Sequence, residues 1–139
     1  MGNQQTFARK ANFEDIQKIT SGKVSGILIN TMSFTDQKCL IKKTVPIDEE
    51  ESIINSHIKG NKEINIIIYD KNSHENKLLT KYKQLVELGF RNVFIYPGGI
   101  FEWLLLQDVY GDSNFPTTSK ELDILKFKGK STLNQLMLE

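Results

Sequence analysis

The feature that most constrains the fold of this chain is a short, isoleucine-rich run that a polar stretch follows directly. The run spans residues 64–69, and the polar stretch spans residues 70–77. Apolar runs of this length are typical of strands buried on both faces of a parallel sheet. The polar stretch contains no apolar residue, so it predicts a loop at the carboxyl end of that strand, where open α/β sheets place their ligand sites.

The rest of the chain continues the alternation of strands and helices. Apolar residues recur three and four positions apart from Leu78 to Leu88, which predicts an amphipathic helix that ends at Gly89. Pro97-Gly98-Gly99 predicts a turn before the next helix. The other expected elements are helices at 13–19, from 49 and from 100, and strands at 27–30, 45–47 and 93–96.

Two C-terminal features predict further packing. The apolar run 104–110 favours a helix buried against the sheet over an exposed docking patch. Thr118 and Glu121 have the spacing of a capping box and predict a short helix that packs on the domain. Leu133, with Leu136 and Met137 after it, could be core packing or a helix for a partner, and the pattern fits both.

Several short motifs resemble those of rhodanese-like domains. Leu88-Gly89-Phe90, Gly98-Gly99-Ile100 and Trp103 occur in the order of that family, and the resemblance covers roughly residues 13–110. It implies an α/β fold of three layers, with a central, mostly parallel sheet and helices on both faces.

The same resemblance places Asp70 where the family has its catalytic cysteine. Sulfur transfer needs a thiolate that accepts sulfur as a persulfide, and a carboxylate cannot do so. The loop also lacks the arginine that closes the family's anion pocket, and the related Cys-x5-Arg phosphatases need both residues. We expect loop amides to bond Asp70 itself and close the pocket. The degenerate loop consists of Asp70, Lys71, Asn72, Ser73, His74, Glu75, Asn76 and Lys77.

Other residues could supply chemistry in its place. Cys39 is the only thiol, and a free cysteine of this kind is usually a buried, reduced side chain. Ser73-His74-Glu75 has the residue types of a triad, but consecutive loop residues rarely reach its geometry. A sulfurtransferase or phosphatase that uses Cys39 or the Ser73 and His74 pair therefore stays an alternative. In a further alternative, Lys71, His74 and Lys77 receive an anion.

Composition excludes other classes of function. The 18 basic and 17 acidic residues are interspersed, which argues against a nucleic-acid surface. Two histidines and one cysteine at unrelated positions give no metal-ligand spacing, and no cofactor is expected. No apolar run approaches the roughly 20 residues that cross a bilayer. We expect a cytoplasmic protein.

The N-terminus adds one modification signal. Met1-Gly2-Asn3-Gln4-Gln5-Thr6 matches the N-myristoylation pattern, in which Gly2 carries the acyl chain. One such chain gives only transient membrane contact. The expected organisation is an arm at 1–12, a rhodanese-like domain at 13–128 and a tail at 129–139.

These features favour a non-catalytic binding or scaffold module with protein partners. The Tyr69-Asp70 pair resembles the same point in centrosomal and ciliary rhodanese-like proteins, whose loop also lacks the cysteine. This likeness implies a component of a ciliary or cytoskeletal assembly, and the signal at Gly2 implies a membrane-tethered adaptor.

Overall fold

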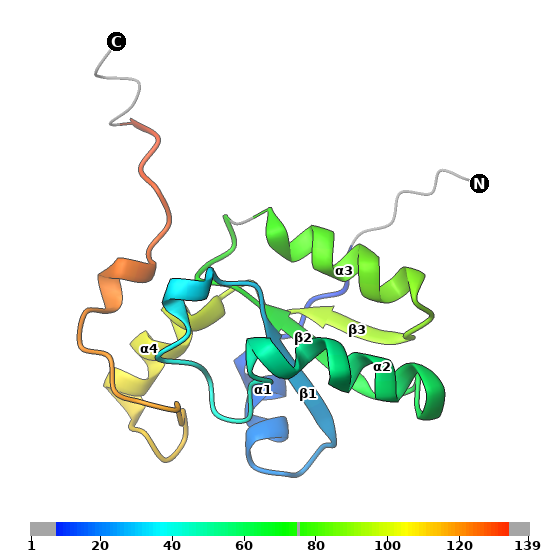
Figure 1. Ribbon diagram of the computed structural model, residues 1–139. Helices are drawn as coiled ribbons and strands as arrows, with labels where there is room; N and C mark the ends of the chain where they lie inside the picture. Colours follow the sequence, from blue (N-terminus) through cyan, green and yellow to red (C-terminus); the bar gives the residue numbers. More distant parts are fainter. Residues whose placement is uncertain (1–7, 75, 134–139) are drawn as a thin grey trace.

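The computed structural model describes residues 8–74 and 76–133, and its strands form a parallel sheet in the order β1-β2-β3. The strands are β1 (Gly26–Asn30), β2 (Asn65–Tyr69) and β3 (Asn92–Ile95), and β2 lies in the centre (Figure 1). Asn30 pairs with Tyr69, so β1 and β2 end at the same edge of the sheet. The loop that follows β2 therefore begins beside the segment that follows β1.

Helices cover both faces of this sheet, as the sequence predicts. On one face lie α1 (Phe13–Thr20) and α4 (Gly99–Tyr110). The other face carries α2 (Glu50–Gly60) and α3 (Lys77–Glu87). The three-layer α/β architecture is confirmed.

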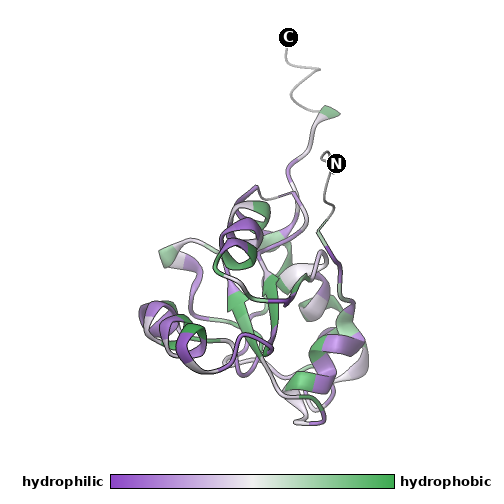
Figure 2. Ribbon diagram, turned by 90° about the vertical axis from the view of Figure 1, so that its right-hand side faces the viewer, coloured by the Kyte–Doolittle hydropathy of each residue, from purple (hydrophilic) through white to green (hydrophobic). Residues whose placement is uncertain are grey.

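The central strand is buried on both sides because both of its faces are apolar. Ile66 and Ile68 pack with α2 and α3, whereas Ile67 and Tyr69 pack with α1 and α4. All four side chains are at most 3% exposed. Figure 2 shows the strands as the hydrophobic centre of the molecule and the helices as mixed. Side chains alternate along a strand, so only an apolar run without polar alternation fits this position.

The predicted amphipathic helix is α3. Leu78, Tyr82 and Leu85 are buried at helical spacing, and the helix is followed by Gly89 at φ +101°. This is the left-handed region that ends many helices at a glycine.

The two outer edges of the sheet differ from the sequence prediction. The prediction of a strand at 45–47 is wrong. Thr44 alone forms a bridge to β1, and Ile47–Glu49 forms the short 3-10 helix η2. Pro46 has no N–H to extend the ladder. On the other edge Lys10 bridges β3, with the Ala11 N–H donating to the Ile95 carbonyl. Lys10 and Ala11, which belong to the segment expected to be an arm, therefore pair with the sheet.

A short C-terminal helix packs on the domain as expected, since the 3-10 helix η3 (Ile124–Phe127) lies beside α4. The capping box expected before it is wrong, because the Thr118 hydroxyl accepts the N–H of Leu40 at 3.0 Å and does not cap this helix. In α4, Leu104 is buried but Val109 is 71% exposed, so only part of the apolar run packs on the sheet.

The Tyr69 hydroxyl ties the end of β2 to the shortened edge, which makes it a testable stability element. It accepts the Ile41 N–H at 3.1 Å and shares a 2.7 Å hydrogen bond with the Thr44 hydroxyl. Tyr69→Phe leaves the buried Ile41 N–H without a partner. We expect the free energy of unfolding to fall by about 1–3 kcal/mol in urea titration. Tyr110→Phe is the matched control, because Tyr110 is 63% exposed. Equal stability of the two variants would contradict this role.

Candidate functional site

The candidate site is the loop after β2, and its first residue is fully buried. Asp70 is 0% exposed although it carries a carboxyl group. The Lys71 N–H donates to Asp70 Oδ1 at 2.6 Å, and the Thr31 hydroxyl donates a short hydrogen bond to Asp70 Oδ2. Both carboxyl oxygens therefore have a partner from the chain itself.

The backbone of the loop is held by the first turn of α4. The Ile100 N–H donates to the Asp70 carbonyl, and the Phe101 N–H donates to the Lys71 carbonyl, each at 3.0 Å. Gly99 permits this approach, since it has φ +65° and an added Cβ would lie 2.4 Å from the Asp70 carbonyl oxygen. These two amides at the helix N-terminus, where anions often bind, are therefore already engaged.

The C-terminal segment lies over the middle of the loop. Asn72 is 7% exposed, its Nδ2 donates to the Phe127 carbonyl at 2.8 Å, and its Oδ1 accepts the His74 N–H at 2.8 Å. A Cβ on Gly129 would lie 2.5 Å from the His74 ring, so the backbone passes directly against that imidazole. Phe127 itself is 2% exposed in the core beside α4. The segment thus covers this part of the loop.

The polar loop is therefore less solvent-exposed than its composition predicts. Burial of Asp70 and Asn72 is possible because each polar atom finds a partner within the chain. The expectation that a loop amide bonds Asp70 holds for Lys71. The second partner is a hydroxyl, from Thr31, instead of an amide.

The triad reading receives no geometric support. Ser73 and His74 are both exposed, and no hydrogen bond joins their side chains in the described part of the loop. Glu75 lies outside the described residues.

The three candidate anion receptors, Lys71, His74 and Lys77, differ in their exposure to solvent. Lys71 is half-buried, whereas Lys77 and the neighbouring Asn76 are exposed. Neither lysine takes part in an ion pair among the residues that the structure describes. His74 is exposed beside Gly129.

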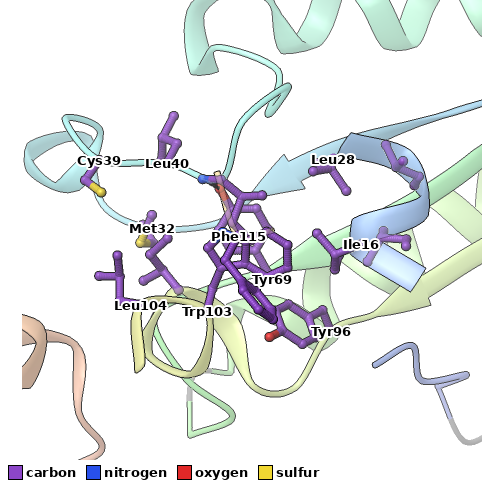
Figure 3. Close-up of a cluster of buried hydrophobic side chains, with 14 of the residues drawn as sticks. Ile16, Leu28, Met32, Cys39, Leu40, Tyr69, Tyr96, Trp103, Leu104 and Phe115 are labelled. Carbon is purple, nitrogen blue, oxygen red and sulfur yellow. Dashed lines mark hydrogen bonds between the residues drawn. The ribbon is translucent and has the colours of Figure 1, made fainter. Parts of the chain in front are cut away.

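Cys39 lies in the hydrophobic core and not in the loop. It is 4% exposed, beside Met32, Leu40 and Leu104 in Figure 3, and its thiol donates to the Ser119 carbonyl at 3.2 Å. Burial raises the pKa of this thiol above its ordinary value. A raised pKa lowers the thiolate fraction at neutral pH, so Cys39 has the character of a structural cysteine.

Sequence reasoning missed three contributors to the site, namely Thr31, Gly99 as a close-approach residue, and Phe127. Thr31 could have been found from strand register, because it follows Asn30, which pairs with Tyr69. Gly99 was noted only as part of a turn. No local pattern marks Phe127, whose contact with Asn72 joins residues 55 positions apart.

The described residues, 8–74 and 76–133, contain no group of three or more histidine, cysteine, aspartate or glutamate side chains placed to hold a metal ion. No helix in these ranges has both the length and the apolarity that a bilayer crossing requires. Gly2 lies outside the described residues.

Several solved structures share this fold. The BH2092 protein from Bacillus halodurans is 18% identical with a TM-score of 0.60, over 95% of this chain and 90% of that one. A yeast protein, Ygr203w, described as a protein tyrosine phosphatase of the Rhodanese family, is 13% identical with a TM-score of 0.58, over 83% and 94%. The Alr3790 protein from Anabaena sp. is 15% identical with a TM-score of 0.56, over 84% and 97%. At these identities the likeness shows the fold alone.

Sequence comparison supplies the family. No curated protein matches the chain significantly. The family model for the Rhodanese-like domain matches residues 16–106, which include every strand and the first turns of α4. The chain therefore belongs to the rhodanese-like domain family.

Proposed function

We propose that this chain is a non-catalytic rhodanese-like module that binds or scaffolds other proteins. The observation that carries the proposal is the buried Asp70 carboxylate at the position that the resemblance assigns to the catalytic cysteine. A carboxylate cannot hold a persulfide. Both of its oxygens are already bonded, by Thr31 and Lys71.

The surroundings of Asp70 support the same proposal. Substrate anions would need free amides, but the Lys71 and His74 amides bond side chains of the loop itself. Phe127 and Gly129 occupy space above the loop that a substrate would need. Moving this segment away from the loop would expose the Phe127 ring, which is 2% exposed, to water.

A binding role is supported by apolar side chains that the fold leaves in solvent. The described surface includes Phe34, Val109 and Leu122, which are 81%, 71% and 83% exposed. Contact with another protein would remove these side chains from water, which is favourable at about 25 cal/mol per Å² of apolar surface. A component of a larger assembly, ciliary or cytoskeletal in kind, fits the likeness at Tyr69-Asp70.

A phosphatase is the competing function, because one protein with this fold is described as a protein tyrosine phosphatase. Such an enzyme would have to use Cys39 or Ser73 with His74. Cys39 is buried with a raised thiol pKa, and its hydrogen bond is made to Ser119 far from the loop in sequence. These features favour the non-catalytic proposal.

Activity assays test this choice directly. We expect thiosulfate-to-cyanide sulfur transfer and para-nitrophenyl phosphate hydrolysis at the background rate of the buffer, because the loop holds no thiol and the Ser73 side chain is not hydrogen-bonded to His74. Cys39→Ser is the matched control, and it should not change either rate. Turnover above background that is abolished by Cys39→Ser or by Ser73→Ala would overturn the non-catalytic proposal.

Anion binding to the loop is tested by thermal unfolding. Low millimolar sulfate should raise Tm no more than sodium chloride of matched ionic strength, because a ligand stabilises only if it binds the native state. Lys77→Ala should give the same difference between the two salts. A sulfate-specific rise in Tm that Lys77→Ala removes would favour the anion-sensing alternative.

Membrane tethering through Gly2 is a separate part of the proposal. Fractionation of native cells into cytosol, membrane and detergent-resistant cytoskeleton compares the protein with Gly2→Ala. If the acyl chain sets the location, Gly2→Ala moves the protein from membrane to cytosol. Retention of both forms in the detergent-resistant pellet would instead favour a stable assembly and reject the tether.

A further inference from the structure

Two hollows that join each other lie at the C-terminal ends of α1 and α4. The larger has a volume of about 830 Å³ and the smaller a volume of about 400 Å³. Thr20 at the end of α1 lines both, as do Ser113 and Pro116 after α4, so the hollows form one continuous surface. None of the loop residues 70–77 lines either hollow, which separates this surface from the loop after β2.

Lysines dominate the charge of this surface. Five lysines and two carboxylates line it, and the carboxylates belong to Glu14 and Asp112. The lysines, all of them exposed, are Lys18, Lys23, Lys42, Lys43 and Lys120. None of these seven side chains takes part in an ion pair among the residues that the structure describes. The surface therefore has an excess of positive charge, and we name it the basic hollow.

Helix ends account for only part of this charge. A lysine stabilises the last turn of a helix, which explains Lys18 in α1 and Lys43, whose Nζ donates to the Ile19 carbonyl at 3.3 Å. Lys42 and Lys120 are placed by pairing between two distant segments. Ile41 bridges Thr117, and the Lys42 N–H donates to the Pro116 carbonyl. Tertiary structure thus gathers lysines that are scattered along the sequence.

A buried amide of α4 adds an open acceptor to the basic hollow. Gln107 is 9% exposed, and its Nε2 donates to the Phe115 carbonyl at 2.8 Å and to Thr117 Oγ1 at 3.0 Å. No group of the described residues donates to its Oε1. Every fully buried side-chain polar atom in the described chain has a partner, so Oε1 must be open to the hollow that Gln107 lines. It can accept a hydrogen bond from an N–H or O–H group of a ligand.

We propose that the basic hollow binds an acidic segment of a partner protein. The carboxylates of the segment would face the lysines, and one of its backbone N–H groups would donate to Gln107 Oε1. A polypeptide supplies both groups together, because every residue except proline carries a backbone N–H beside its side chain. The inference rests on the proposed binding function and adds the charge of the partner and the surface that receives it.

The lining separates this partner from other anions. Single-stranded nucleic acid stacks its bases on aromatic side chains, and no aromatic residue of the described chain lines the basic hollow. A membrane surface takes up apolar side chains beside the basic ones, but Pro116 is the one apolar residue of this lining. Glu14 and Asp112 would repel an unbroken row of phosphates, whereas the acidic residues of a peptide can be spaced to avoid them.

Two synthetic peptides test the proposal with the full-length protein. One peptide alternates glutamate with serine, and the other replaces every glutamate by lysine. In NMR spectra of the ¹⁵N-labelled chain, the glutamate peptide should shift the backbone amides of Lys42, Lys43 and Lys120. It should also shift the side-chain amide of Gln107, because a hydrogen bond to Oε1 polarises the Nε2 protons. The lysine peptide should shift none of these signals.

Charge-reversal variants then show whether the basic hollow carries the binding. The double variant Lys42→Glu with Lys120→Glu should weaken the glutamate peptide about ten-fold or more, because two attractive contacts become repulsive. Lys59→Glu with Lys83→Glu is the matched control, since it changes the net charge equally at exposed residues of α2 and α3. This control should bind as the original chain does. Thermal unfolding establishes that both double variants fold.

Two further probes test the class of partner at the same salt concentration. A single-stranded oligonucleotide and vesicles that contain phosphatidylserine should each bind more weakly than the glutamate peptide. Tighter binding of either probe would overturn the assignment to a protein segment. Concentration-dependent shifts of the same amides without peptide would overturn it as well, because they would assign the hollow to a second copy of this chain.

The remaining outcomes also overturn the inference. These outcomes are absence of binding, equal binding of the two peptides, equal effects of the two double variants, and an unshifted Gln107 side chain. None of them bears on the non-catalytic proposal, which depends on the activity assays. Conversely, sulfur transfer or phosphate hydrolysis would overturn the proposed function and leave the peptide result intact.

Discussion

Burial of β2 on both faces is the constraint on which the rest of this structure depends. The strand pairs with β1 and β3 and contributes side chains to both hydrophobic clusters. Its apolar residues require helices on each face, since either face alone would expose isoleucine side chains to water. The strand also fixes where the following loop emerges, beside Thr31 and the first turn of α4.

That burial continues one residue past the strand and decides the character of the site. A carboxyl group without contact to water needs hydrogen-bond partners or it destabilises the fold. Asp70 finds them in Thr31 and in the amide of Lys71, and Asn72 finds its partner in the carbonyl of Phe127. The loop that the family resemblance expects to hold an anion is instead bonded to the end of β1, to α4 and to the C-terminal segment. The proposed binding function then moves to the outer surfaces of the helices.

The sequence by itself determined the strands and helices whose periodicity reports burial directly. The apolar run 64–69 predicts a strand buried on both faces. The spacing from Leu78 to Leu88 predicts a helix with one buried face, and Gly89 marks its end. The parallel α/β fold follows from these elements. The sequence also placed Asp70 at the end of the central strand. It failed at Thr118 and Glu121, where a hydroxyl with helix-capping spacing bonds Leu40 instead.

Only the tertiary structure decided what surrounds Asp70. Its partners come from another strand end, and Phe127 reaches Asn72 across 55 residues, so neither contact leaves a local pattern. The Glu50 to Lys81 ion pair between α2 and α3 likewise depends on how two separate helices are spaced on the sheet. Periodicity along one helix reports which side is buried, but the distance between two helices is set by the side chains that pack beneath both.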